Sequence, residues 1–93
     1  MYEIVRKEAL RPTVTLYEIK APLIAKKAQP GQFIILRVDE NGERIPITIN
    51  AYDPEKGTVT IIVQTAGATT AKLSHLNQGD CLQDFVGPLE AVA

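Results

Sequence analysis

The sequence Arg44-Ile45-Pro46-Ile47-Thr48-Ile49 follows an Asn41-Gly42 pair and reads as one short strand. An Asn-Gly pair between apolar segments is typical of two-residue hairpin turns, whose residues need positive φ. The pair therefore predicts a strand over residues 44–50 that runs antiparallel to the apolar segment at residues 33–38. Prolines remove a backbone donor and occur in strands at edges or bulges. We expect part of this strand's backbone to be left free for another contact.

Short β-type segments separated by turn residues account for most of the remaining chain. Residues 33–38 are apolar on both faces until Arg37, which predicts a strand that is covered on both sides. Residues 23–29 are rich in Ala and Lys, and they fit either a helical turn or a loop. Further strands are predicted at residues 2–9, 13–21, 58–64 and 81–86, the last ended by Gly87-Pro88, and a helix capped by Thr69 or Thr70 ends at Leu76.

These elements predict an all-β fold in a single domain that spans residues 1–93. The strands do not alternate with long helices, so a parallel doubly wound sheet is not expected. A closed or nearly closed barrel leaves few sheet edges exposed, which suits a chain of 93 residues. We therefore expect a six-stranded antiparallel Greek-key barrel with one short helix.

Composition excludes several classes of function. The net charge of -1 provides no field for gathering nucleic acid or coating an anionic membrane. A single cysteine, Cys81, excludes an internal disulfide framework and a four-thiolate metal site, and we expect no metal site. No apolar run approaches the ~20 residues that span a bilayer, and the N-terminus does not resemble a signal peptide, so a cytoplasmic protein is expected. Ser74 and His75 are neighbours that point in different directions on a helix, so no catalytic residue is assigned.

Gly67-Ala68-Thr69-Thr70 places a glycine and two hydroxyls at the start of the predicted helix. Free N–H groups at a helix start attract anions, so this segment is a candidate for binding phosphate. An ordinary capped helix has the same sequence pattern. The segment alone leaves both interpretations open.

Taken together, the motifs resemble the flavin-binding barrel of the ferredoxin–NADP reductase superfamily. Within it, the likeness is greatest to the electron-transfer subunit of dihydroorotate dehydrogenase and to the small subunit of NADH-dependent ferredoxin–NADP oxidoreductase, also called sulfide dehydrogenase. The matching motifs, in the order of the family, are Pro30-Gly31-Gln32-Phe33, residues 44–49, residues 67–70, Gly79-Asp80 and Gly87-Pro88-Leu89.

The resemblance implies that this chain binds FAD. Thr48 would lie beside the flavin ring, with Pro46 and Ile47 along it, and Thr70 would hold the diphosphate. In many members an arginine stands at the position of Ile45, so Arg44 would reach the phosphate from the neighbouring position or the charge would be met elsewhere. The full set of implied cofactor-binding residues is Arg44, Pro46, Ile47, Thr48, Gln64, Thr65, Gly67, Thr69 and Thr70.

The family also implies a function for a longer protein. Its members continue into a nicotinamide-binding domain and an iron–sulfur segment, neither of which follows Ala93 here. We expect an FAD-binding module that passes electrons between NAD(P) and an iron–sulfur protein or a catalytic partner subunit, inactive as an isolated chain and able to self-associate. The alternative is a barrel without flavin or catalysis that docks a partner, since fold alone does not set function.

Overall fold

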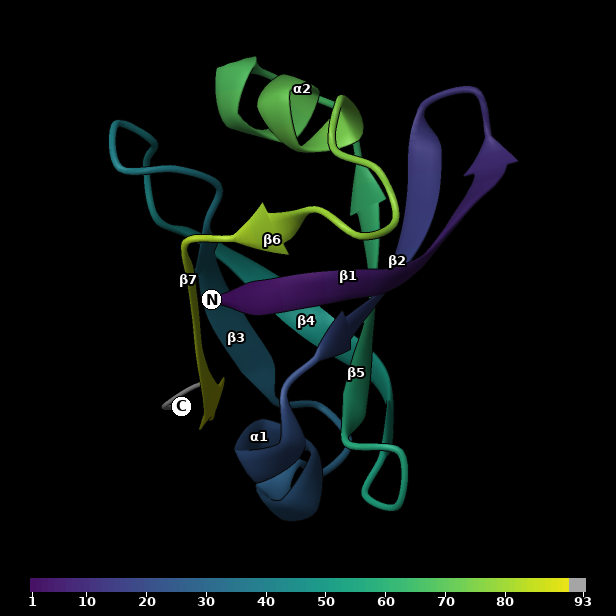
Figure 1. The fold of residues 1–93 in the computed structure, drawn as a ribbon, viewed down its shortest axis with the longest axis vertical. Helices are drawn as coiled ribbons and strands as arrows, with labels where there is room; N and C mark the ends of the chain where they lie inside the picture. The colour runs from purple at the N-terminus through teal and green to yellow at the C-terminus, as the bar shows by residue number, and fades with distance from the viewer. Residues whose placement is uncertain (91–93) are drawn as a thin grey trace.

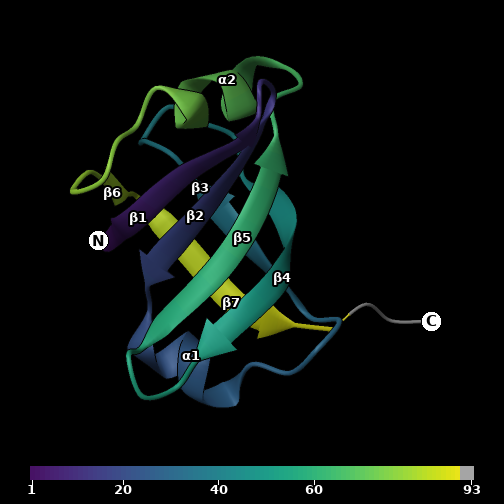
Figure 2. The ribbon, with the colours of Figure 1, turned by 90° about the vertical axis from the view of Figure 1, so that its right-hand side faces the viewer.

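The computed structural model describes residues 1–90 as a nearly closed antiparallel barrel with a helix at each end (Figures 1 and 2). The sheet order is β6-β1-β2-β5-β4-β3-β7, and β6 and β7 are consecutive in the chain, so the two ends of the sheet are brought together. The predicted all-β antiparallel barrel is confirmed. The strands are β1 (Tyr2–Arg11), β2 (Val14–Lys20), β3 (Phe33–Arg37), β4 (Ile45–Asp53), β5 (Thr58–Gln64), β6 (Cys81–Leu82) and β7 (Asp84–Leu89), and the helices are α1 (Pro22–Lys27) and α2 (Ala68–Ser74).

The described residues contain seven strands because the predicted strand at residues 81–86 is divided at Gln83. Cys81 and Leu82 pair with β1, whereas β7 pairs with β3. The chain therefore bends at Gln83, and its two parts pair with the two ends of the sheet. The N–H of Gln83 donates to the carbonyl of Arg37 (3.0 Å) at that bend. The prediction that Gly87-Pro88 ends the last strand is wrong, because both residues lie within β7.

The loop between β3 and β4 differs from the predicted two-residue turn. It spans residues 38–44, and no residue of the Asn41-Gly42 pair has positive φ. The N–H of Gly42 donates to the carbonyl of Asp39 (3.1 Å), and the N–H of Asn41 donates to the Asp39 carboxylate (3.0 Å). This Asx-type turn is the competing arrangement that the aspartate stabilises. The antiparallel pairing of β3 with β4 is as predicted.

Helix α1 resolves the open interpretation of residues 23–29 and makes a second helix in the described chain. Pro22 stands at its start, where a missing N–H costs nothing, and Lys26 and Lys27 occupy its last turn. Ile24 and Ala25 are buried and close one end of the barrel. None of the helices in residues 1–90 is long and apolar enough to cross a membrane.

Helix α2 covers the opposite end, and three hydrogen bonds connect the carbonyl groups of its last residues and of Leu76, just after it, to the barrel. The ammonium of Lys7 donates to the carbonyls of Ser74 and Leu76, both at 2.7 Å, and the Tyr17 hydroxyl donates to that of Leu73 (3.3 Å). Burial raises the pKa of Tyr17. Leu73 is fully buried against the barrel core.

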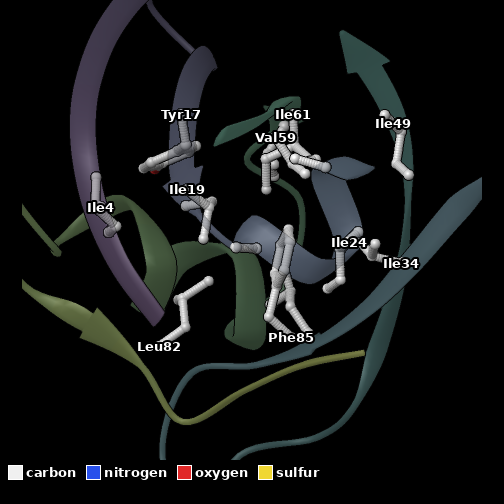
Figure 3. Packing of buried hydrophobic residues seen from close by; sticks show 14 of the residues in the cluster. Ile4, Tyr17, Ile19, Ile24, Ile34, Ile49, Val59, Ile61, Leu82 and Phe85 are labelled. Carbon is white, nitrogen blue, oxygen red and sulfur yellow. The ribbon is translucent and has the colours of Figure 1, made fainter. Parts of the chain in front are cut away.

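The core fills the inside of the barrel with aliphatic side chains and two aromatic rings. Figure 3 shows Tyr17, Ile19 and Phe85 pointing into it, and each is at most 1% exposed. On β3, Ile34 and Leu36 are fully buried, whereas Phe33 and Ile35 are only half-buried on the outer face. Within residues 1–90, the prediction that this strand is covered on both sides is therefore wrong.

Candidate functional site

The start of β4 and the end of β5 have no ladder between them. β4 pairs with β3 from Ile45 to Thr48, but its pairing with β5 begins only at Ile49, opposite Ile61. The end of β5 pairs with β2 on its other side, as far as Gln64. Before Ile49 on β4 and after Ile61 on β5, the two strands are therefore not paired with each other. These unpaired edges lie at the end of the barrel that carries α2 (Figure 1). The predicted free backbone around Pro46 lies here.

The residues predicted on β4 are divided between the two faces of that strand. Pro46 and Thr48 are exposed on the outer face. Ile47 pairs with the buried Ile34, is half-buried and packs against the core. The three side chains therefore cannot all lie along one flat ring, and a shared contact would use the strand's backbone edge.

The second predicted stretch surrounds the start of α2. Helix α2 begins at Ala68, earlier than predicted, because Gly67 precedes it with φ of 98°. The prediction that Thr69 or Thr70 caps the helix from outside is thus wrong, since both lie in its first turn. The Thr70 hydroxyl accepts the N–H of Ala66 (2.7 Å) and donates to the carbonyl of Gly67 (3.3 Å). A side chain that reaches back to the residues before a helix in this way orders the turn that leads into it.

The last two predicted residues connect β5 to that turn. Gln64 is exposed at the end of the strand. The N–H of Thr65 donates to the carbonyl of Thr13 (2.7 Å), which continues the pairing of this segment with the β1–β2 turn. Thr48 is exposed on β4, and Thr69 is half-buried in the first turn of α2.

An ion pair joins α2 to the β3–β4 loop. The Lys72 ammonium on α2 lies 2.9 Å from the carboxylate of Asp39 in the β3–β4 loop. The hydrogen bond from Lys72 is the main cause that lowers the pKa of Asp39. Because this loop leads directly into β4, the structure brings α2 and the start of β4 to the same end of the barrel. Sequence reasoning missed Lys72, although its position three residues after Thr69 places both on one helix face.

Arg44 extends in a different direction from Lys72. Its guanidinium lies 3.5 Å from the carboxylate of Asp84 on β7, across β3 from β4. The same carboxylate accepts a 2.7 Å hydrogen bond from Nε of Arg37. Arg44 must therefore leave Asp84 to contact a ligand beside Thr70.

The Ser74 hydroxyl donates to the carbonyl of Ala71 (2.6 Å). Residues 1–90 hold no group of three His, Cys, Asp or Glu residues placed to bind a metal. A groove of about 380 Å³ opens at the α1 end, away from every predicted site residue, and is lined by Tyr2, Ala21, Pro22, Leu23, Ile24, Lys27, Val86 and Gly87.

Comparison with known proteins identifies relatives that are much longer than this chain. No family model matches. An uncharacterized protein of Clostridium beijerinckii, encoded in the adh 3' region, is 56% identical over 89 residues, which are 96% of this chain and 30% of that protein. The dihydroorotate dehydrogenase B electron transfer subunit homolog of Thermotoga maritima is 42% identical over 94% of this chain and 31% of its own length.

A solved structure supports the same relationship. It is that of the NADH-dependent reduced ferredoxin–NADP oxidoreductase, described in connection with flavin-based electron bifurcation. One of its chains matches with a TM-score of 0.92 and 41% identity, over 95% of this chain and 32% of that chain. The chain thus spans about a third of the length of the relatives that it matches.

Proposed function

We propose that this chain is the FAD-binding module of an electron-transferring oxidoreductase. It belongs to the ferredoxin reductase-like family that includes the dihydroorotate dehydrogenase B electron-transfer subunits. Bound flavin supplies the redox chemistry, while the protein positions the cofactor and tunes it. Electrons would pass between a nicotinamide cofactor and an iron–sulfur protein or a catalytic partner subunit. The relatives' name as electron transfer subunits supports this role.

The observation that carries the proposal is the loss of pairing between β4 and β5 beside the start of α2. Unpaired backbone edges offer donors and acceptors in an extended row, which suits a long ligand with many polar atoms. Thr48 and Thr69 add hydroxyl groups, and Lys72 adds a cation. An elongated ligand with an anionic centre, such as a flavin dinucleotide, fits this set of groups.

Each predicted residue then has a role that follows from its place. Pro46, Ile47 and Thr48 would bind the flavin ring through the free edge of β4, and Gln64 and Thr65 would contact the ribityl or adenosine part. Gly67, Thr69 and Thr70 would hold the diphosphate at the turn into α2. Arg44 would add positive charge nearby once it is released from Asp84.

Titration of the purified chain with FAD tests the proposal. Ligand that binds only the folded state raises the melting temperature as its concentration rises, and FAD should do so here. The isolated chain should not oxidise NADH or NADPH, because the proposed role of residues 1–93 is to hold the flavin. A melting temperature that FAD leaves unchanged at millimolar concentration would exclude the proposal.

A partner-docking barrel without flavin is the second candidate. It is favoured by apolar side chains that remain exposed near the α1 end, Leu23 at 76% and Val86 at 54%. Such groups mark interaction surfaces when they adjoin one another, and both line the same groove. This candidate predicts no response to FAD, so the same titration separates the two functions.

A further inference from the structure

We infer that Lys72 supplies the positive charge that meets the diphosphate of the flavin, exchanging its contact with Asp39 for the ligand's oxygen atoms. This inference rests on the proposed function and adds a binding residue to it. A diphosphate is anionic at neutral pH, and a protein that holds it needs a cation within hydrogen-bonding reach.

The two arginines that flank the β3–β4 loop are engaged at β7. Arg37 and Arg44 both contact the carboxylate of Asp84 on β7. Arg37 also donates to the carbonyl of Glu40 (3.2 Å), which fixes it within the β3–β4 hairpin. Both guanidinium groups therefore contact β7, which lies across β3 from β4.

Lys72 is placed between the two sides of the proposed site. It projects from α2 on the face that carries Thr69, because residues three apart are neighbours on a helix. Its ammonium reaches the β3–β4 loop, 2.9 Å from Asp39, and that loop leads into β4. A ligand bound along the start of β4 and the turn before α2 would lie beside this ammonium.

The Lys72–Asp39 pair can exchange partners at low cost. Its side chains are 49% and 47% exposed, and exposed ion pairs contribute little to stability because water and salt screen them. A diphosphate offers several charged oxygens in place of one carboxylate, and charge-assisted hydrogen bonds to it are stronger than neutral ones. The exchange therefore favours the ligand and leaves Asp39 to solvent.

Paired titrations with FAD and with riboflavin, which lacks phosphate, test this assignment. Lys72→Gln should weaken FAD binding about three- to thirtyfold while leaving riboflavin binding unchanged, and Lys72→Arg should keep most of the FAD affinity. Asp39→Asn should bind FAD at least as tightly as the unaltered chain, because it removes the competing carboxylate. Lys26→Gln is the matched control, since it removes the same charge from α1 at the other end of the barrel.

The outcomes separate this inference from the proposed function. FAD binding by the unaltered chain, with equal FAD affinity in Lys72→Gln and Lys26→Gln, would overturn the role of Lys72 and leave the proposed function standing. Equal weakening of FAD and riboflavin by Lys72→Gln would also overturn it, because the effect would not act through phosphate. Failure of the unaltered chain to bind FAD would overturn both. Thermal melting of each variant shows that it remains folded.

Discussion

The ammonium of Lys7 on β1 lies 2.7 Å from the carbonyl oxygen of Ser74 at the end of α2, a residue 67 positions away in the sequence. The same ammonium donates to the carbonyl of Leu76 (2.7 Å) and lies 5.9 Å from the centre of the Tyr17 ring. A cation near the last carbonyls of a helix satisfies groups that have no partner within the helix. Lys7 is therefore the main polar connection between α2 and the barrel.

Lys7→Met should lower the free energy of unfolding by about 1–3 kcal/mol, because it keeps much of the side-chain volume but leaves two part-buried carbonyls without their donor. Urea denaturation measures this loss, and hydrogen exchange should become faster in α2 than in β2 or β5. Lys26→Met serves as the control and should change stability little, since Lys26 is exposed on α1. A Lys7 variant as stable as the control would show that the Lys7 hydrogen bonds do not hold α2 in place.

Gly87 on β7 has no room for a side chain. A Cβ there would lie 2.7 Å from Cγ2 of Ile34 and 3.1 Å from the carbonyl oxygen of Phe33. Gly87→Ala should therefore destabilise the protein by about 1–3 kcal/mol, because β7 must move away from β3. Gly42→Ala is the comparison, since a Cβ at Gly42 meets nothing closer than 3.3 Å and its φ is not positive. Equal melting temperatures for the two variants would contradict the close approach of β7 to β3.

Asp39 should contribute to the pH dependence of stability. Its pKa is lowered in the folded state, chiefly by the hydrogen bond from Lys72, so the folded state binds its proton less readily than the unfolded state does. The contribution is therefore present above the unfolded pKa of ~3.9 and is lost as pH falls through the lower folded value. In urea denaturation, the unaltered chain and Asp39→Asn should differ at pH 6 and converge toward pH 2. A difference that does not change with pH would exclude this linkage.

Local sequence signals predicted the central strands of the fold and failed where two interactions competed. The strand predicted at residues 58–64 matches β5. Buried and exposed side chains alternate along it, and a strand with one buried face has only one stable register. The strand predicted at residues 81–86 is divided because Cys81 and Leu82 pair with β1, a long-range contact that no local pattern encodes. The two-residue turn predicted at Asn41-Gly42 does not form, because the carboxylate of Asp39 accepts the N–H of Asn41 and stabilises a different turn.

The candidate site shows the same division. The sequence predicted an unpaired edge near Pro46 and a helix start at residues 67–70, because proline in a strand and glycine before a helix are local signals. Both stretches lie at the α2 end of the barrel. It could not show that Arg44 turns toward Asp84, since that contact depends on β7 lying across β3 from β4. Lys72 was overlooked because an exposed helical lysine is ordinary until its partner in the β3–β4 loop is known.

Thr70 offers the most direct separation of folding from binding in the proposed site. Its hydroxyl accepts the N–H of Ala66, so Thr70→Val should cost about 0.5–2 kcal/mol of stability, as does the loss of other side-chain caps at helix starts. The same substitution should weaken FAD binding and spare riboflavin, if the hydroxyl also contacts the diphosphate. Thr70→Ser keeps the hydroxyl and should preserve both stability and FAD affinity.

A Thr70→Val chain that loses stability but binds FAD as tightly as the unaltered chain would show that this hydroxyl only orders the turn before α2. Isothermal titration with both ligands, together with urea denaturation of each variant, distinguishes these results.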